Sequence, residues 1–202
     1  MDFWLRALMK CSLVCALSLA PLAAPAQQVS DQMTEEQRLA KARDVVQLFT
    51  DRLRSELAAA LKSGPAANAI GFCQTSAPDL TTQIAEEAGI EVARVALKLR
   101  NPENAPDEWE EAILQKFQAQ AVSGADAGKL EHYEIITTAE GDKMFRYMRG
   151  IPVGEKCLVC HGTDVKQDVK AEIARLYPED KAIGFKLGEL RGAFSLVQLI
   201  TE

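Results

Sequence analysis

The sequence predicts an α+β domain, in which a small antiparallel sheet is flanked by helices and preceded by one long N-terminal helix. Two observations carry this prediction. Residues 34–63 repeat apolar side chains every three or four positions, as an amphipathic helix does. Residues 132–149 instead contain two β-branched and aromatic segments around a turn, which is typical of a hairpin.

The first third of the chain is predicted to be helical. Thr34 and Gln37 form a capping-box pattern at the start of the long helix, which ends near Gly64. Pro65 favours the start of a second helix, which carries Cys73. Residues 76–79, Ser-Ala-Pro-Asp, favour a break and a third helix that ends at Gly89.

Strands and helices are expected to alternate in the rest of the chain. Residues 90–99 are rich in Val, Ala and Leu and predict a strand, and a helix follows from residue 106 to Phe117. The hairpin has its turn at 139–142. A loop at 157–161, a helix over 165–177 and a last strand over 188–199 complete the order.

The N-terminus has the layout of a secretory signal peptide. Arg6 and Lys10 precede an apolar stretch that is too short to span a bilayer, and Ala-Pro-Ala at 24–26 is a small-residue cleavage site. We therefore expect a signal peptide at residues 1–26, a domain over 27–202 and a periplasmic location. No later segment is apolar enough to predict a membrane span. The net charge of −6 argues against nucleic acid as a partner.

The most specific motif is Cys-Leu-Val-Cys-His at residues 157–161. Two cysteines separated by two residues and followed by histidine have the spacing of covalent haem attachment. Cys157 and Cys160 would each bind one vinyl group, and His161 would ligate the iron. The motif therefore predicts one haem c. A Cys157–Cys160 redox disulfide and a zinc site that includes Cys73 are the weaker alternatives.

The residues themselves leave several candidates for the second axial ligand. Only Cys73, Cys157 and Cys160 remain after removal of the signal peptide, so Cys73 has no disulfide partner if the other two bind haem. His132, Met144 and Met148 are the other possible donors. A free cysteine is also often a small buried apolar residue.

Three blocks resemble a known family. They are residues 101–110, the haem motif at 157–162, and residues 177–185 continuing to 188–195. Together they are similar to periplasmic haem c proteins with a PAS-like fold, which occur alone or as the extracytoplasmic sensor of signalling proteins. The resemblance covers roughly residues 65–202. It implies a PAS-like domain in which His161 and Cys73 are the axial ligands.

Several side chains are candidates for contacts to the ring. Cations on the predicted strands could bind the propionates, and aromatic residues could pack on the porphyrin. The cations are Arg94, Lys98, Arg100, Arg146 and Arg149, and the aromatic residues are Phe72, Phe145 and Tyr147. No single cation is favoured by the sequence.

The resemblance implies a sensor of redox state or of a diatomic gas, with ligand exchange at Cys73. A thiolate ligand favours Fe(III), which implies a low potential. The alternative is a soluble carrier that exchanges electrons with a redox partner protein. An enzymatic function is the least favoured hypothesis, because the sequence shows no Arg/His pair placed for peroxide cleavage. The long first helix could pack on its own domain or form a homodimer.

Overall fold

A four-stranded antiparallel sheet forms the centre of the computed structural model, which describes residues 33–201. The strands are β1 (Glu91–Val95), β2 (Glu131–Thr137), β3 (Lys143–Pro152) and β4 (Leu190–Ile200), in the order β1-β4-β3-β2. β2 and β3 form the predicted hairpin, and Gly141 has φ +96° in its turn. β4 therefore lies between β1 and β3, although nearly a hundred residues separate it from β1 in the chain.

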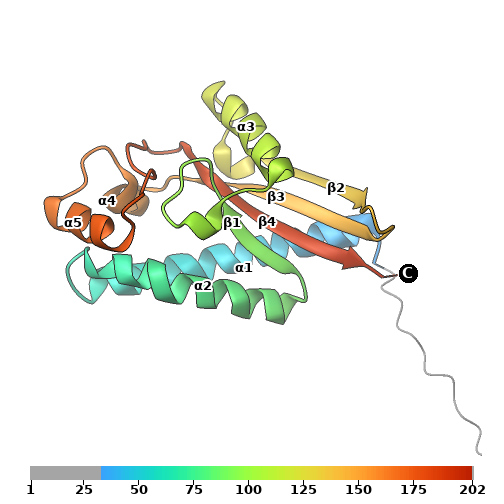
Figure 1. Cartoon of the computed structure of the whole chain (residues 1–202), viewed down its shortest axis with the longest axis horizontal. Coiled ribbons are helices and arrows are strands. Elements are labelled where there is room, and N and C mark those ends of the chain that lie inside the picture. The colour runs from blue at the N-terminus through green and yellow to red at the C-terminus, as the bar shows by residue number, and fades with distance from the viewer. Residues whose placement is uncertain (1–32, 202) are drawn as a thin grey trace, which may run out of the picture.

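Two long helices cover one face of the sheet. α1 (Glu35–Lys62) and α2 (Asn68–Ala88) lie side by side below the strands (Figure 1). The capping box of α1 at Thr34 and Gln37 is present as predicted. The shared core contains side chains of α1, α2, β3 and β4, including Phe49, Ile84, Tyr147, Phe194 and Leu196.

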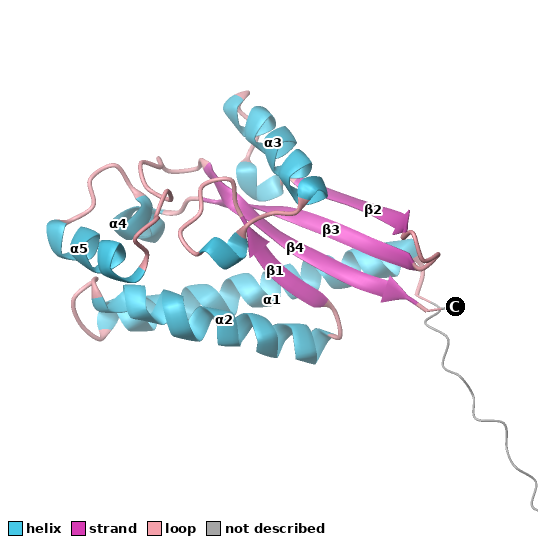
Figure 2. Ribbon diagram, in the orientation of Figure 1, coloured by secondary structure: helices cyan, strands magenta, loops and turns pink. Residues whose placement is uncertain are grey.

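The opposite face of the sheet is covered by α3 (Glu108–Val122), as Figure 2 shows. Asp107 and Glu110 form a second capping box at its start. Leu114 and Phe117 of α3 pack on Met148 of β3 and Ala193 of β4. Adjacent residues on β3, Tyr147 and Met148, thus point to opposite faces, as the pleat of a strand requires.

The haem motif lies at one end of the sheet, together with two short helices. α4 (Leu158–His161) contains most of the motif, and α5 (Gln167–Leu176) follows it. Val169 and Ile173 of α5 pack on Ile70 of α2. This contact holds the motif region against the N-terminal half of α2 (Figure 1).

The α+β class, the antiparallel sheet and the long N-terminal helix are confirmed, and the arrangement is consistent with a PAS-like fold. One prediction for the helices is wrong. The expected break at residues 76–79 is absent, and α2 continues through Pro78. Proline removes one hydrogen bond inside a helix. Here the helix persists because Ala77, Leu80 and Ile84 are buried on the same side of α2.

Two local predictions also need correction. The strand expected over 90–99 ends at Val95, after which the chain leaves the sheet toward the motif. The motif itself is helical, because a 3-10 turn (Glu155–Cys157) leads directly into α4. None of the helices in residues 33–201 is long and apolar enough to cross a bilayer. The signal-peptide prediction for residues 1–26 lies outside the described residues.

Candidate functional site

The four residues that the sequence predicts as the haem site line one cleft. Cys73 comes from α2, while Cys157, Cys160 and His161 come from the motif. The cleft offers about 180 Å³ to water-sized molecules and is open to solvent on one side. Its other walls come largely from α1, β1 and β4, and their apolar side chains include Leu53, Leu57, Leu61, Val95 and Phe194.

The helical turn places the motif thiols on one wall. Cys157 and Cys160 are three residues apart, and side chains at that spacing share one face of a helix. Gly162 ends the turn, and its N–H donates to the carbonyl of Leu158 at 3.0 Å. A Cβ atom at position 162 would lie 2.6 Å from that oxygen, so only glycine fits there.

His161 is held in one tautomer. Its Nδ1 lies 2.6 Å from the carbonyl oxygen of Ala182. Because a carbonyl can only accept, Nδ1 must carry the proton, and Nε2 keeps its lone pair. Burial, together with the positive charges of Arg191 and Arg100, lowers the pKa of His161 to about 3. The imidazole is therefore neutral at pH 7, which is the state that a metal ligand needs.

Arg100 joins the motif to the segment that positions His161. Its guanidinium donates to both carboxylate oxygens of Asp180, at 3.0 and 3.1 Å. The same side chain donates to the carbonyls of Cys160 at 2.7 Å and of Ala182 at 3.2 Å. Ala182 thus accepts from both Arg100 and His161. Arg100 was a propionate candidate, but its Nε and one terminal nitrogen, Nη2, already donate within the protein.

Cys73 lies on α2 and is half-buried at the cleft wall. Burial raises the pKa of its thiol, and the nearby charges of Arg94, Arg100 and Arg191 partly offset this. Burial also raises the pKa of Cys160 to about 11, again with Arg100 acting in the opposite direction. All three described cysteines are free thiols.

Two comparisons relate the chain and its fold to known proteins. The Tll0287-like family model matches residues 23–198. The chain belongs to the Tll0287-like family. A search of the solved structures found the crystal structure of the cyanobacterial haem protein Tll0287, with a TM-score of 0.62 and 27% identity. That match covers 84% of this chain and 99% of Tll0287. A comparison with curated proteins returned no match.

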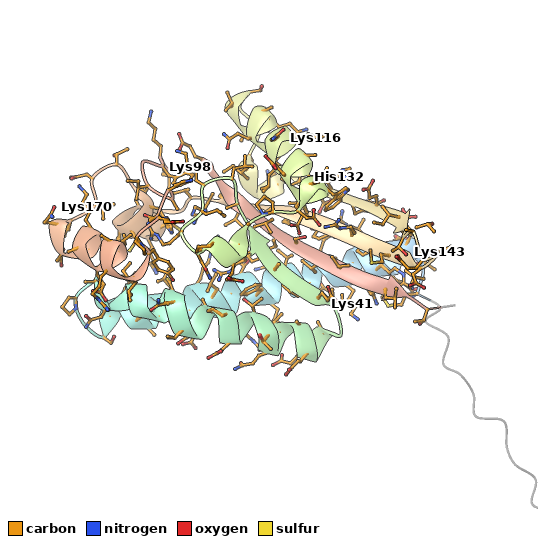
Figure 3. The ribbon with its side chains drawn as sticks, viewed as in Figure 1. Lys41, Lys98, Lys116, His132, Lys143 and Lys170 are labelled. Atoms are coloured by element: carbon orange, nitrogen blue, oxygen red, sulfur yellow. The ribbon has the colours of Figure 1, made fainter. Side chains whose placement is uncertain are left out.

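The other donors predicted for the sixth position lie elsewhere in this Tll0287-like chain. His132 is on β2, where its ring packs 5.9 Å from that of Trp109, close to α3 (Figure 3). Met148 is fully buried beneath α3, and Met144 pairs with Leu199 at the other end of β3. None of the three lines the cleft.

The zinc alternative needs several ligand side chains around one ion. Residues 33–201 contain no group of three or more His, Cys, Asp or Glu side chains placed to bind a metal ion. Cys73, Cys157, Cys160 and His161 share the cleft but are not gathered into such a group.

The structure separates the candidate cations. Lys98 lies over the ring of Phe185 and lines a different hollow. Arg146 pairs with Asp107, and Arg149 pairs with Glu131, both outside the cleft. Only Arg94 and Arg100 of the predicted set line the cleft.

The sequence analysis missed two cations of the site, Lys156 and Arg191. The position of Lys156 next to Cys157 and the place of Arg191 within the third family block were the available signals. Among the aromatic candidates, Phe72 lines the cleft, whereas Phe145 and Tyr147 are part of the core between the sheet and the two helices α1 and α2.

Proposed function

We propose that this chain binds one haem c covalently through Cys157 and Cys160, with His161 and Cys73 as the axial ligands. The related structure is that of a haem protein. The observation that carries the proposal is that all four residues, from two distant parts of the chain, line one mainly apolar cleft. Its mainly apolar walls and its cationic side chains suit an apolar ring with two carboxylates.

Each residue has a defined task in this proposal. The two motif thiols would form thioether bonds, and His161 would offer Nε2 while Ala182 holds Nδ1. Cys73 would approach from α2. When bound, haem supplies an iron that changes oxidation state and takes small diatomic ligands. The apolar walls would exclude water from the ring. Arg100 would hold the motif and Ala182 in fixed relative positions through its hydrogen bonds to both.

We propose that the biological role is sensing of redox state or of a diatomic gas in the periplasm. Support comes from the position of Cys73, which is on a different element from the other three residues. α2 packs along α1 over most of its length (Figure 1). If Cys73 left the iron or bound it again, the change would therefore act on the helical layer and not on the motif alone.

Electron transfer with a redox partner protein is the second candidate, and one contact favours it. The ring of Phe185 meets that of His161 edge to face, with centroids 6.3 Å apart. Phe185 also lines a separate hollow that opens on the surface, together with Lys98 and Arg191. This contact links the histidine to a surface that a partner could reach.

The ligand set is tested by spectroscopy on protein produced with a cytochrome c maturation system. We expect a low-spin ferric EPR signal of the thiolate type, which Cys73→Ser abolishes. His132→Asn is the matched control, because His132 lies outside the cleft, and it should leave the spectrum unchanged. An unchanged spectrum in Cys73→Ser would exclude this ligand.

Covalent attachment and role are tested on the same material. Haem should stay with the wild-type chain on a denaturing gel and be lost in Cys157→Ala/Cys160→Ala. For the sensor role, reduction or CO should change the coordination at Cys73. If both oxidation states keep the same two ligands, the electron-carrier role is supported instead.

A further inference from the structure

Arg94 is an unusual residue of the cleft. It is on β1, is half-buried, and lines the cleft near Cys73. Its side chain makes no hydrogen bond or ion pair with any residue in the described part of the chain. Its guanidinium lies 5.7 Å from the centre of the Phe49 ring, and Cys73 and Tyr177 are titratable groups that act on it electrostatically. No carboxylate is among these contacts.

Other arginines around the sheet are partnered. Arg100 is paired with Asp180, Arg146 with Asp107, and Arg149 with Glu131. Arg191, which shares the cleft with Arg94, donates to the carbonyl of Lys98 at 3.1 Å. Arg94 thus differs from each of these in that its guanidinium has no hydrogen-bond or ion-pair partner within residues 33–201.

A cation placed among apolar side chains without a counterion destabilises the folded state. The lining of the cleft contains four cationic residues and no Asp or Glu; they are Arg94, Arg100, Lys156 and Arg191. Asp180 neutralises one of them, Arg100. The cleft therefore carries excess positive charge, which an anionic ligand would balance.

We propose that Arg94 binds a propionate carboxylate of the haem. A guanidinium offers paired N–H donors that match the two oxygens of a carboxylate, and such hydrogen bonds are among the stronger ones in proteins. This inference rests on the proposed haem binding. It adds an anchor that the sequence could not distinguish from four other cations.

The proposal predicts opposite effects on the free and the bound protein. Arg94→Met keeps an unbranched apolar side chain in place of the arginine stem but removes the unpaired charge. The protein without haem should therefore unfold at a temperature about 2 °C higher, or more. Its affinity for haem should fall at least about tenfold, because a charge-assisted hydrogen bond is lost.

The experiment uses the full chain in a Cys157→Ala/Cys160→Ala background, so that haem binds reversibly. Haemin and haemin dimethyl ester are titrated into this protein with and without Arg94→Met. We expect the substitution to weaken haemin binding at least tenfold and to leave binding of the ester nearly unchanged. Arg52→Met is the control, because its ion pair with Glu87 is on the surface and outside the cleft.

Three results would overturn the proposal. Equal losses for haemin and the ester would mean that Arg94 acts on another group, such as the Cys73 sulfur. A lower unfolding temperature for Arg94→Met without haem would mean that Arg94 stabilises the fold itself. Absence of binding by both porphyrins to the parent protein would refute haem binding as well, and is thus distinguished from failure of the Arg94 assignment alone.

Discussion

Replacement of Arg100 by methionine should strongly destabilise the fold. The side chains of Arg100 and Asp180 are each only 8% exposed, and Arg100 makes four hydrogen bonds to three residues. Arg100→Met leaves the Asp180 carboxylate buried without its counterion. Breaking a buried pair in this way typically costs about 3–5 kcal/mol. For a chain of this size, that corresponds to an unfolding temperature about 6–20 °C lower.

Thermal unfolding of the protein without haem, followed by circular dichroism, measures this effect. Arg52→Met is the control, because the Arg52–Glu87 pair has side chains 39% and 51% exposed, and an ion pair on the surface contributes little to stability. Asp180→Asn added to Arg100→Met should recover part of the loss by removing the buried charge. The reasoning is refuted if Arg100→Met lowers the unfolding temperature no more than the control does.

Three further predictions concern other parts of the structure. Gly162→Ala should lower both thermal stability and the yield of covalent haem, because its Cβ would lie 2.6 Å from the Leu158 carbonyl oxygen; circular dichroism and a haem-stained gel measure the two losses. The hydrogen bond from Arg43 holds the pKa of Glu131 below its ordinary value of 4.5, so the ionised carboxylate stabilises the folded state above that value and this contribution is lost as the pH falls. Acid unfolding of Glu131→Gln should therefore depend less on pH than that of the wild type. A homodimer through α1 would appear in sedimentation velocity as a species of twice the monomer mass at micromolar concentration, whereas a monomer at all concentrations would exclude it.

Much of the fold follows from local patterns in the sequence. The apolar repeat of residues 34–63 and its capping box locate α1 to within one or two residues. The hairpin and its turn at 139–142 are equally local, and β2 and β3 pair around them. The haem motif is local too, because its two cysteines and the histidine lie within five residues. Patterns of this kind need no knowledge of distant contacts.

The errors arise where distant contacts decide. From its neighbouring residues alone, Pro78 predicts a break in the helix. Burial of one side of α2 nevertheless keeps the helix continuous. The propionate candidates form a similar case. Arg94, Arg100 and Arg146 look alike in the sequence, and only the folded chain shows that Asp180 and Asp107 pair with two of them. The hydrogen bond from His161 to Ala182 spans twenty-one residues and has no sequence signal.

The continuity of α2 bears on the proposed sensor role. In two separate helices, Cys73 would belong to a short segment that could shift without disturbing the core. In one helix, Cys73 is joined rigidly to Leu80 and Ile84, which pack with Phe49 of α1 and with the sheet. Dissociation of Cys73 from the iron would then affect the position of the whole helix. Ser76→Gly should weaken this link, because Ser76 is an exposed residue between Cys73 and Leu80, and glycine makes the middle of a helix flexible. We expect Ser76→Gly to leave the oxidised spectrum unchanged while reducing the change in α1 hydrogen exchange that follows reduction. Equal exchange changes in both proteins would contradict this coupling.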